Sequence, residues 1–71
     1  MDYLDRLKIA RMRKHFSQAA LSRSLGFSQA TYGLYEARKN KMDVETFGEI
    51  CRLLDVTPNQ MLGFEPWDEN E

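Results

Sequence analysis

The segment SQATYGLYEARKNK, residues 28–41, places one long amide near the start of an apolar or small-residue stretch and a group of cations directly after it. The amide belongs to Gln29, which can form two hydrogen bonds at once with N6 and N7 of an adenine. The cations belong to Arg38, Lys39 and Lys41, which can neutralise phosphate groups. These residue types in this order favour binding to a nucleic acid.

Charge is unevenly distributed along the chain, although the net charge is only −1. Residues 6–41 contain nine arginines and lysines but one acid, Glu36, whereas residues 43–71 contain eight acids and one cation, Arg52. If the fold keeps the two halves apart, one surface is strongly positive and suits a phosphate-rich partner. The alternative is ordinary solvated charge, which a single acid in so long a stretch disfavours.

Other classes of function find little support in the composition. A chain of 71 residues predicts a single small domain. One cysteine, Cys51, and one histidine, His15, give neither a disulfide nor a metal-ligand cluster. No nucleophile–base pair or carboxylate pair falls on a shared face, so we expect no enzyme and no cofactor. The absence of an apolar run long enough for a membrane span and of a secretory signal predicts a soluble, cytoplasmic protein with no membrane partner.

Apolar residues recur at helical spacing, so the sequence predicts an all-α fold of five helices. The first predicted helix ends near residue 14, the second covers about 18–25, and the third covers about 29–37. The fourth runs from 44 to about 54, and the fifth ends near 62. Their predicted N-caps are Asp2, Ser17, Ser28, Asp43 and Thr57. The fourth helix is predicted to bury one continuous stripe, formed by Val44, Phe47, Ile50, Cys51 and Leu54.

Two short helices joined by the turn LGFS indicate a helix-turn-helix, with Gly26 in the turn and small Ser22 where the helices approach. The predicted inward residues are Leu21, Leu25, Phe27, Tyr32 and Tyr35. On these residues the chain resembles the Cro/repressor-type helix-turn-helix family, often called the XRE family, over about residues 4–64. The resemblance implies a compact five-helix, lambda-repressor-like DNA-binding domain in residues 1–64, with the helix-turn-helix at about 18–37, followed by an acidic tail, 65–71.

The resemblance also implies where double-stranded DNA binds. The third helix would lie in the major groove, with base contacts from Gln29, Ala30, Gly33 and Leu34. Phosphate contacts would come from Ser17, Gln18, Ser28, Thr31, Arg38, Lys39, Asn40 and Lys41, and Gln18 could also brace Gln29. Relatives often carry a polar or basic reader at the position of Leu34, so this helix offers few hydrogen bonds beyond those of its first turn.

The resemblance implies a homodimeric bacterial or phage-encoded regulator, most simply a repressor on an inverted-repeat operator. The alternative is an antitoxin-like or regulatory module whose third helix docks a protein partner through Leu34. Two alternatives also stay open for Phe64 and Trp67, which either cover the core of their own domain or form a twofold dimer seam.

Arg11 lies on the face of the first helix that should be buried, and Glu36 is the one acid of the positive half. We expect an ion pair between them, because an isolated buried charge is costly and because the family resemblance implies the same pair. His15 and Arg38 stand where the family commonly has a glycine, so we expect strained left-handed backbone at these helix ends.

Overall fold

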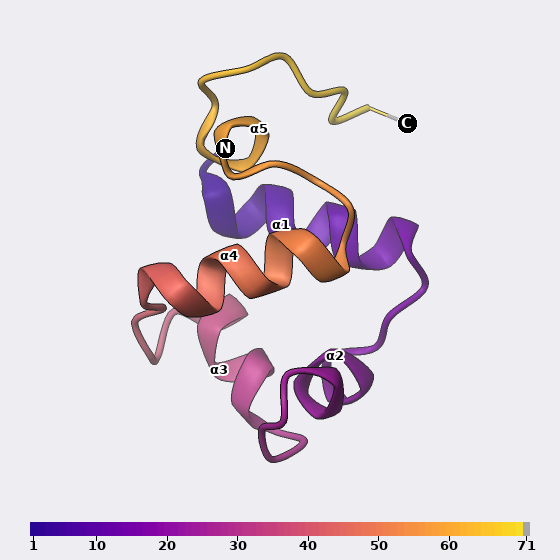
Figure 1. The fold of residues 1–71 in the computed structure, drawn as a ribbon, viewed down its shortest axis with the longest axis vertical. Coiled ribbons are helices and arrows are strands. Elements are labelled where there is room, and N and C mark those ends of the chain that lie inside the picture. The colour runs from indigo at the N-terminus through magenta and orange to yellow at the C-terminus, as the bar shows by residue number, and fades with distance from the viewer. Residues whose placement is uncertain (71) are drawn as a thin grey trace.

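The computed structural model describes residues 1–70, which form five helices and no strand (Figure 1). The helices are α1 (Tyr3–Arg13), α2 (Gln18–Ser24), α3 (Thr31–Glu36), α4 (Val44–Leu53) and α5 (Pro58–Leu62). The all-α prediction is confirmed. None of these helices is both long and apolar enough to cross a membrane.

Four of the predicted N-caps are confirmed. The side chains of Asp2, Ser17, Asp43 and Thr57 each accept a hydrogen bond from a backbone N–H in the first turn of the helix that follows. The caps of α1 and α5 are reciprocal capping boxes, in which the side chains of Asp5 and Gln60 accept a hydrogen bond from the backbone N–H of the capping residue. Local sequence therefore decides where these four helices begin.

The predicted start of the third helix is wrong. α3 begins at Thr31 rather than Gln29, and its N-cap, Ala30, makes no side-chain capping bond. The cap comes from the neighbouring helix, because Oγ of Ser22 accepts the N–H of Tyr32 at 2.9 Å. The hydroxyls of Ser28 and Thr31 instead pair with each other at 2.8 Å. Gln29 therefore lies in the turn that precedes α3.

Left-handed residues follow the ends of the helices. Glycine fills this position at Gly26 and Gly63, whereas His15, Arg38 and Asp55 adopt φ angles of 60°, 63° and 57° with a full side chain. The strain expected at His15 and Arg38 is therefore present, and Asp55 is a third case that the sequence did not reveal. Each such turn still satisfies carbonyl groups at the helix end, as in the bonds from Lys39 N–H to Leu34 O and from Arg38 N–H to Tyr35 O.

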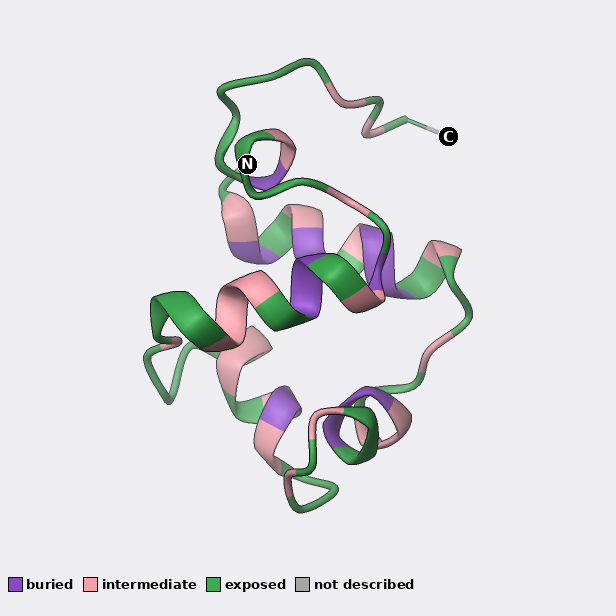
Figure 2. Ribbon diagram, viewed as in Figure 1, coloured by how far each residue is buried: buried purple, intermediate pink, exposed green. Residues whose placement is uncertain are grey.

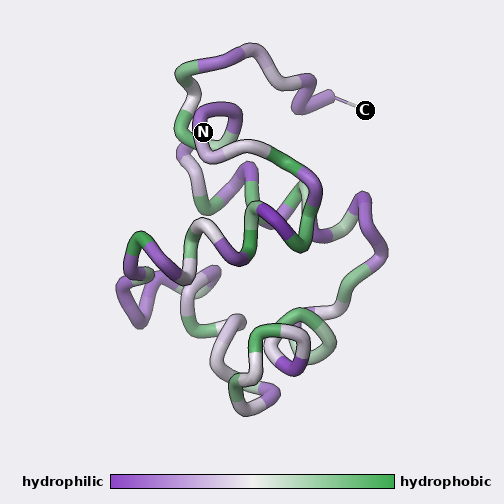
Figure 3. The backbone as a smooth tube through the Cα atoms, in the orientation of Figure 1, coloured by the Kyte–Doolittle hydropathy of each residue, from purple (hydrophilic) through white to green (hydrophobic). Residues whose placement is uncertain are grey.

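The core is built from at least one residue of every helix (Figure 2). Its buried apolar members are Leu4, Leu7, Ala10, Leu21, Tyr32, Ile50, Cys51, Leu54 and Met61. Figure 3 shows hydrophobic and hydrophilic residues following one another along the helices. Burial raises the pKa of Cys51 to about 11, so this cysteine is a neutral core residue.

The predicted stripe of α4 is wrong at its first residue. Val44 is 84% exposed, whereas Ile50 and Cys51 of the same stripe are buried. The N-terminal turn of α4 lies at the left edge of the molecule in Figure 2, in agreement with the exposure of Val44.

Residues 65–70 fold back along α1 at the end of the molecule opposite α2 and α3 (Figure 1). Arg6 Nε donates to Glu69 at 2.7 Å, and the guanidinium carbon of Arg13 lies 4.5 Å from the centre of the Trp67 ring. Trp67 also packs on the core, whereas Phe64 is 78% exposed. The expected separation of acidic and basic halves is therefore incomplete, because the acidic tail neutralises part of α1.

Gly48 provides a first test of these assignments. It lies inside α4, and a Cβ atom added there would meet nothing within 4 Å. We expect Gly48→Ala to raise the free energy of unfolding by about 0.5–1 kcal/mol, because alanine loses less backbone entropy in a helix. Urea denaturation followed by circular dichroism measures this change, and a loss of stability would show that space around Gly48 is needed.

Candidate nucleic-acid interface

α2 and α3 form a crossed pair connected by a short turn (Figure 1). Leu21 of α2 and Tyr32 of α3 are fully buried between the pair and the rest of the domain. Ser22, also fully buried, joins the two helices through its bond to the backbone of Tyr32. Gly26, at φ 77°, makes the turn possible. This arrangement is a helix-turn-helix.

Most of the predicted base-contacting residues lie at the surface around the start of α3. Gln29, Ala30 and Leu34 are exposed, and Gly33 is half-buried. The side chain of Gln29 has no hydrogen-bond partner within residues 1–70, so its amide is available to a ligand. The exposed fraction of Leu34 is 37%, which leaves an apolar contact on the same surface.

Gln18, the first residue of α2, makes a contact that the sequence did not predict. Its Nε2 donates to Oε1 of Glu36 at 2.8 Å, across the interface between α2 and α3. Gly33 lies directly beneath this amide, because a Cβ atom added to Gly33 would fall 2.8 Å from Gln18 Oε1. The amide therefore braces the end of α3 rather than Gln29.

The ion pair between Arg11 and Glu36 is present and joins α1 to α3. Arg11 Nε and Nη2 donate to the two oxygens of Glu36 at 2.8 and 3.2 Å, and Nη1 donates to the carbonyl of Phe16 at 2.8 Å. The side chains are only 10% and 6% exposed. Fork-shaped pairing of this kind fixes both groups in one geometry.

Opposing effects act on the protonation of this buried pair. Burial raises the pKa of Glu36, but hydrogen bonds from Arg11 and Gln18 outweigh it and bring that pKa below its ordinary value. Burial also raises the pKa of the neighbouring Tyr32, and the negative charge of Glu36 adds to this effect. At neutral pH Glu36 is therefore ionised and Tyr32 is neutral.

The loop after α3 presents the predicted phosphate-binding groups. Lys39, Asn40 and Lys41 are exposed, and within residues 1–70 neither lysine pairs with a carboxylate. Arg38 differs, because it donates to both oxygens of Asp2 at 2.7 and 3.0 Å. The hydrogen bond from Arg38 is the main reason that the pKa of Asp2 lies far below its ordinary value. This pair is about half exposed, so a phosphate group can compete for Arg38.

The remaining predicted polar residues lie around the same two helices. Ser17 is exposed and caps α2, with its Oγ accepting the N–H of Ala20 at 3.0 Å. Ser28 is exposed and Thr31 is half-buried beside the turn. The structure therefore brings Ser17 and Gln18 of α2 to the same helix pair as Ser28, Gln29 and Thr31.

A family model described as helix-turn-helix matches residues 7–61, which is well over half of the chain. The chain belongs to the Cro/repressor-type helix-turn-helix family. It is therefore a DNA-binding regulator, with α2 and α3 as its helix-turn-helix. Searches of the curated proteins and of the solved structures give no match.

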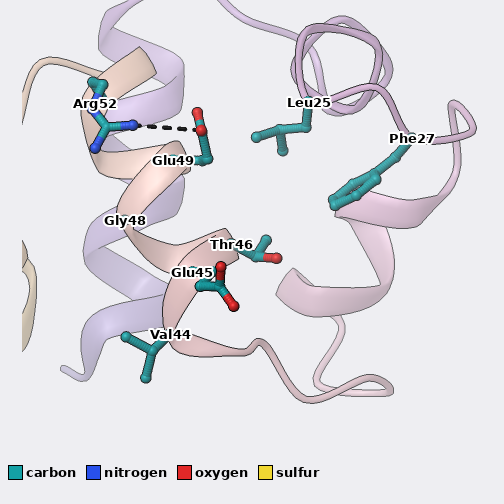
Figure 4. Close-up of a pocket in the computed structure, with 8 residues that line it drawn as sticks. All are labelled: Leu25, Phe27, Val44, Glu45, Thr46, Gly48, Glu49 and Arg52. Carbon is teal, nitrogen blue, oxygen red and sulfur yellow. Dashed lines mark ion pairs between the residues drawn. The ribbon is translucent and has the colours of Figure 1, made fainter.

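This helix-turn-helix protein also has a surface cleft of about 480 Å³ between the turn and α4 (Figure 4). Leu25 and Phe27 form one wall, and the other wall includes Glu45 and Glu49, the latter paired with Arg52 at 3.4 Å. Acidic groups on this wall disfavour phosphate. No group of three potential metal ligands occurs here or elsewhere in the part of the chain that the structure describes.

Proposed function

We propose that this helix-turn-helix protein is a sequence-selective repressor that binds an inverted-repeat operator as a dimer. The observation that carries the proposal is the placement of functional groups at the two ends of α3. An unpartnered amide, Gln29, lies before its first turn, and two exposed lysines, Lys39 and Lys41, follow its last turn. The proposed base reader and the two proposed phosphate contacts thereby flank one short helix.

The proposed base contacts differ in chemistry. Gln29 would pair with the N6 and N7 atoms of an adenine, while Ala30 and Leu34 would contact thymine methyl groups. Gly33 adds no side chain of its own, and the Gln18 amide lies over the backbone there. Because hydrogen-bonding groups are few, the selected sequence is also expected to depend on the shape and deformability of the DNA.

The proposed phosphate contacts surround this reading surface. They comprise Ser17, Ser28, Thr31, Lys39, Asn40 and Lys41, with Arg38 joining them when phosphate replaces Asp2. The tail and its acids lie at the opposite end of the domain (Figure 1), so they do not repel DNA at α3.

A dimer would place two copies of α3 in successive major grooves, about one DNA turn apart. Support for a twofold seam comes from Phe64 and from Leu62, which are 78% and 46% exposed. Trp67 is less suited to the seam, since it is half-buried on the core and lies against Arg13. A dimer bound at a promoter would repress transcription by blocking access to that promoter. Such a regulator would act in the bacterial cytoplasm.

Selection of bound sequences from a random duplex pool tests this proposal directly. We expect an inverted repeat, and we expect Gln29→Ala to lose about 1–3 kcal/mol of discrimination at one base pair of each half-site. Binding to random duplex should change little, because Gln29 is uncharged.

The matched comparison is Lys39→Ala, which should weaken binding to every duplex alike. If Gln29→Ala kept full affinity for the selected operator and its single-base variants, base reading by Gln29 would be wrong. A pool without any preferred sequence would contradict a sequence-selective regulator and favour docking of a protein at Leu34.

A further inference from the structure

The cleft between the turn and α4 has one apolar wall. Leu25 and Phe27 point from the helix-turn-helix toward α4 (Figure 4), and both residues are half-buried. Glu45, Thr46 and Glu49 border the opposite side. The volume of about 480 Å³ is within the range of sites that hold a ligand. The cleft therefore offers an apolar contact beside carboxylates.

The charge of the cleft is negative in balance. Glu49 is paired with Arg52 at 3.4 Å, and both side chains are exposed. Glu45 is exposed as well and forms no ion pair within residues 1–70. One carboxylate next to the apolar wall thus lacks a cation, and a partner that supplies one complements the cleft.

The cleft is separate from the surface proposed for DNA. Its lining contains none of the proposed base or phosphate contacts, although Phe27 directly precedes Ser28. The acidic tail of the same chain does not fill it, because that tail lies along α1, where Arg6 and Arg13 hold it. A partner in the cleft would therefore sit beside bound DNA without competing for it.

We propose that this cleft binds a separate protein through a basic segment, with a bulky apolar side chain between Phe27 and α4 and a neighbouring lysine or arginine on Glu45. Such a segment matches both walls at once, whereas an acidic segment would be repelled by Glu45 and Glu49. A free small molecule fits less well, because small-molecule sites enclose most of their ligand and this cleft is open at the surface. The inference adds a protein partner to the regulator and does not depend on how it reads its operator.

Selection from a displayed library of random peptides provides a probe for the cleft. We expect the selected peptides to combine leucine, phenylalanine or tryptophan with an adjacent lysine or arginine. Fluorescence anisotropy then measures the affinity of one labelled, selected peptide for the parent and its variants. Glu45→Gln should weaken binding about two- to fivefold, the usual range for one exposed ion pair. Glu65→Gln is the matched control, because Glu65 is an exposed acid of the tail outside the cleft and its loss changes the net charge equally.

Gly48→Leu tests the apolar part of the cleft without changing any charge. Gly48 lines the cleft, and a Cβ atom added there would meet nothing within 4 Å. Leucine favours a helix more than glycine does, so the variant should fold. Its side chain would occupy space that the partner needs, and we expect a loss of about tenfold or more in peptide affinity, the value of burying one bulky apolar side chain. Binding to random duplex should stay as in the parent, which excludes misfolding as the cause.

Three kinds of result would overturn the inference. A library that yields no binding peptide, or only peptides that bind Glu45→Gln and Gly48→Leu as tightly as the parent, would show that the cleft does not bind a basic segment. Equal losses in Glu45→Gln and Glu65→Gln would make the attraction one of overall charge. Self-association of the parent that Gly48→Leu abolishes, measured by sedimentation, would make a second copy of the chain the occupant.

Discussion

Arg11→Met is expected to lower the free energy of unfolding by about 3 kcal/mol or more, the usual cost of removing one partner of a buried ion pair. Met preserves most of the volume of the arginine side chain, so a cavity contributes little. The loss arises because Glu36, which is 6% exposed, would remain charged and lose two hydrogen bonds, while the carbonyl of Phe16 would lose its donor. For a small domain with about 5–15 kcal/mol of stability this is a large fraction.

Urea denaturation of parent and variant measures this effect. Arg38→Ala is the matched control, because Arg38 also holds a carboxylate through two bonds but at an exposed site, where the loss should be far smaller. A double replacement of Arg11 and Glu36 by Met should be less harmful than Arg11→Met alone, since no buried charge is left unpaired. Equal losses for Arg11→Met and Arg38→Ala would contradict the special role of the buried pair.

The pH dependence of stability provides an independent measure of the same pair. The folded-state pKa of Glu36 lies below its ordinary value of 4.5, so the unfolded state binds more protons and the parent loses stability as the pH falls below about 4.5. Without Arg11, burial would be opposed mainly by the hydrogen bond from Gln18, so the pKa of Glu36 would lie higher than in the parent and the variant would lose less stability on acidification. The difference between the two proteins should therefore shrink below pH 4.5. A difference that stayed constant from pH 7 to pH 3 would contradict this assignment.

Removing Lys39 and Lys41 together is expected to weaken binding to all duplexes and to flatten its salt dependence. Each phosphate contact contributes about 0.9 to the slope of log K against log salt concentration, so the double alanine variant should lose about 1.8 from that slope. Both lysines are exposed and lack a carboxylate partner in the part of the chain described, which leaves their full charge for phosphate. Titration of a fluorescent random duplex at several salt concentrations measures the slope.

Lys8→Ala is the control for net charge. Lys8 is also exposed but lies on α1, outside the helix-turn-helix. Its removal should change the slope much less than removal of either loop lysine. A similar change in slope per lysine at all three positions would show that overall charge, rather than direct contact after α3, drives binding.

The sequence by itself determined the features of this protein that depend on neighbouring residues. The caps at Asp2, Ser17, Asp43 and Thr57 bond to the turn that follows them, so their position is readable without the fold. The helical spacing of apolar residues likewise identified the five helices, and the left-handed residues at His15 and Arg38 follow from helix ends. Together with the match over residues 7–61, these local patterns are sufficient for the family.

The tertiary structure alone decided the contacts between residues distant in sequence. Ser22 replaces Ser28 as the cap of α3, because the crossing of α2 and α3 brings its hydroxyl to the N–H of Tyr32. Gln18 binds Glu36 instead of bracing Gln29, since the same crossing leaves space over Gly33. No periodic pattern encodes such distances, which depend on how the helices pack. The place where Gln18, Gly33 and Glu36 meet therefore became visible only in three dimensions.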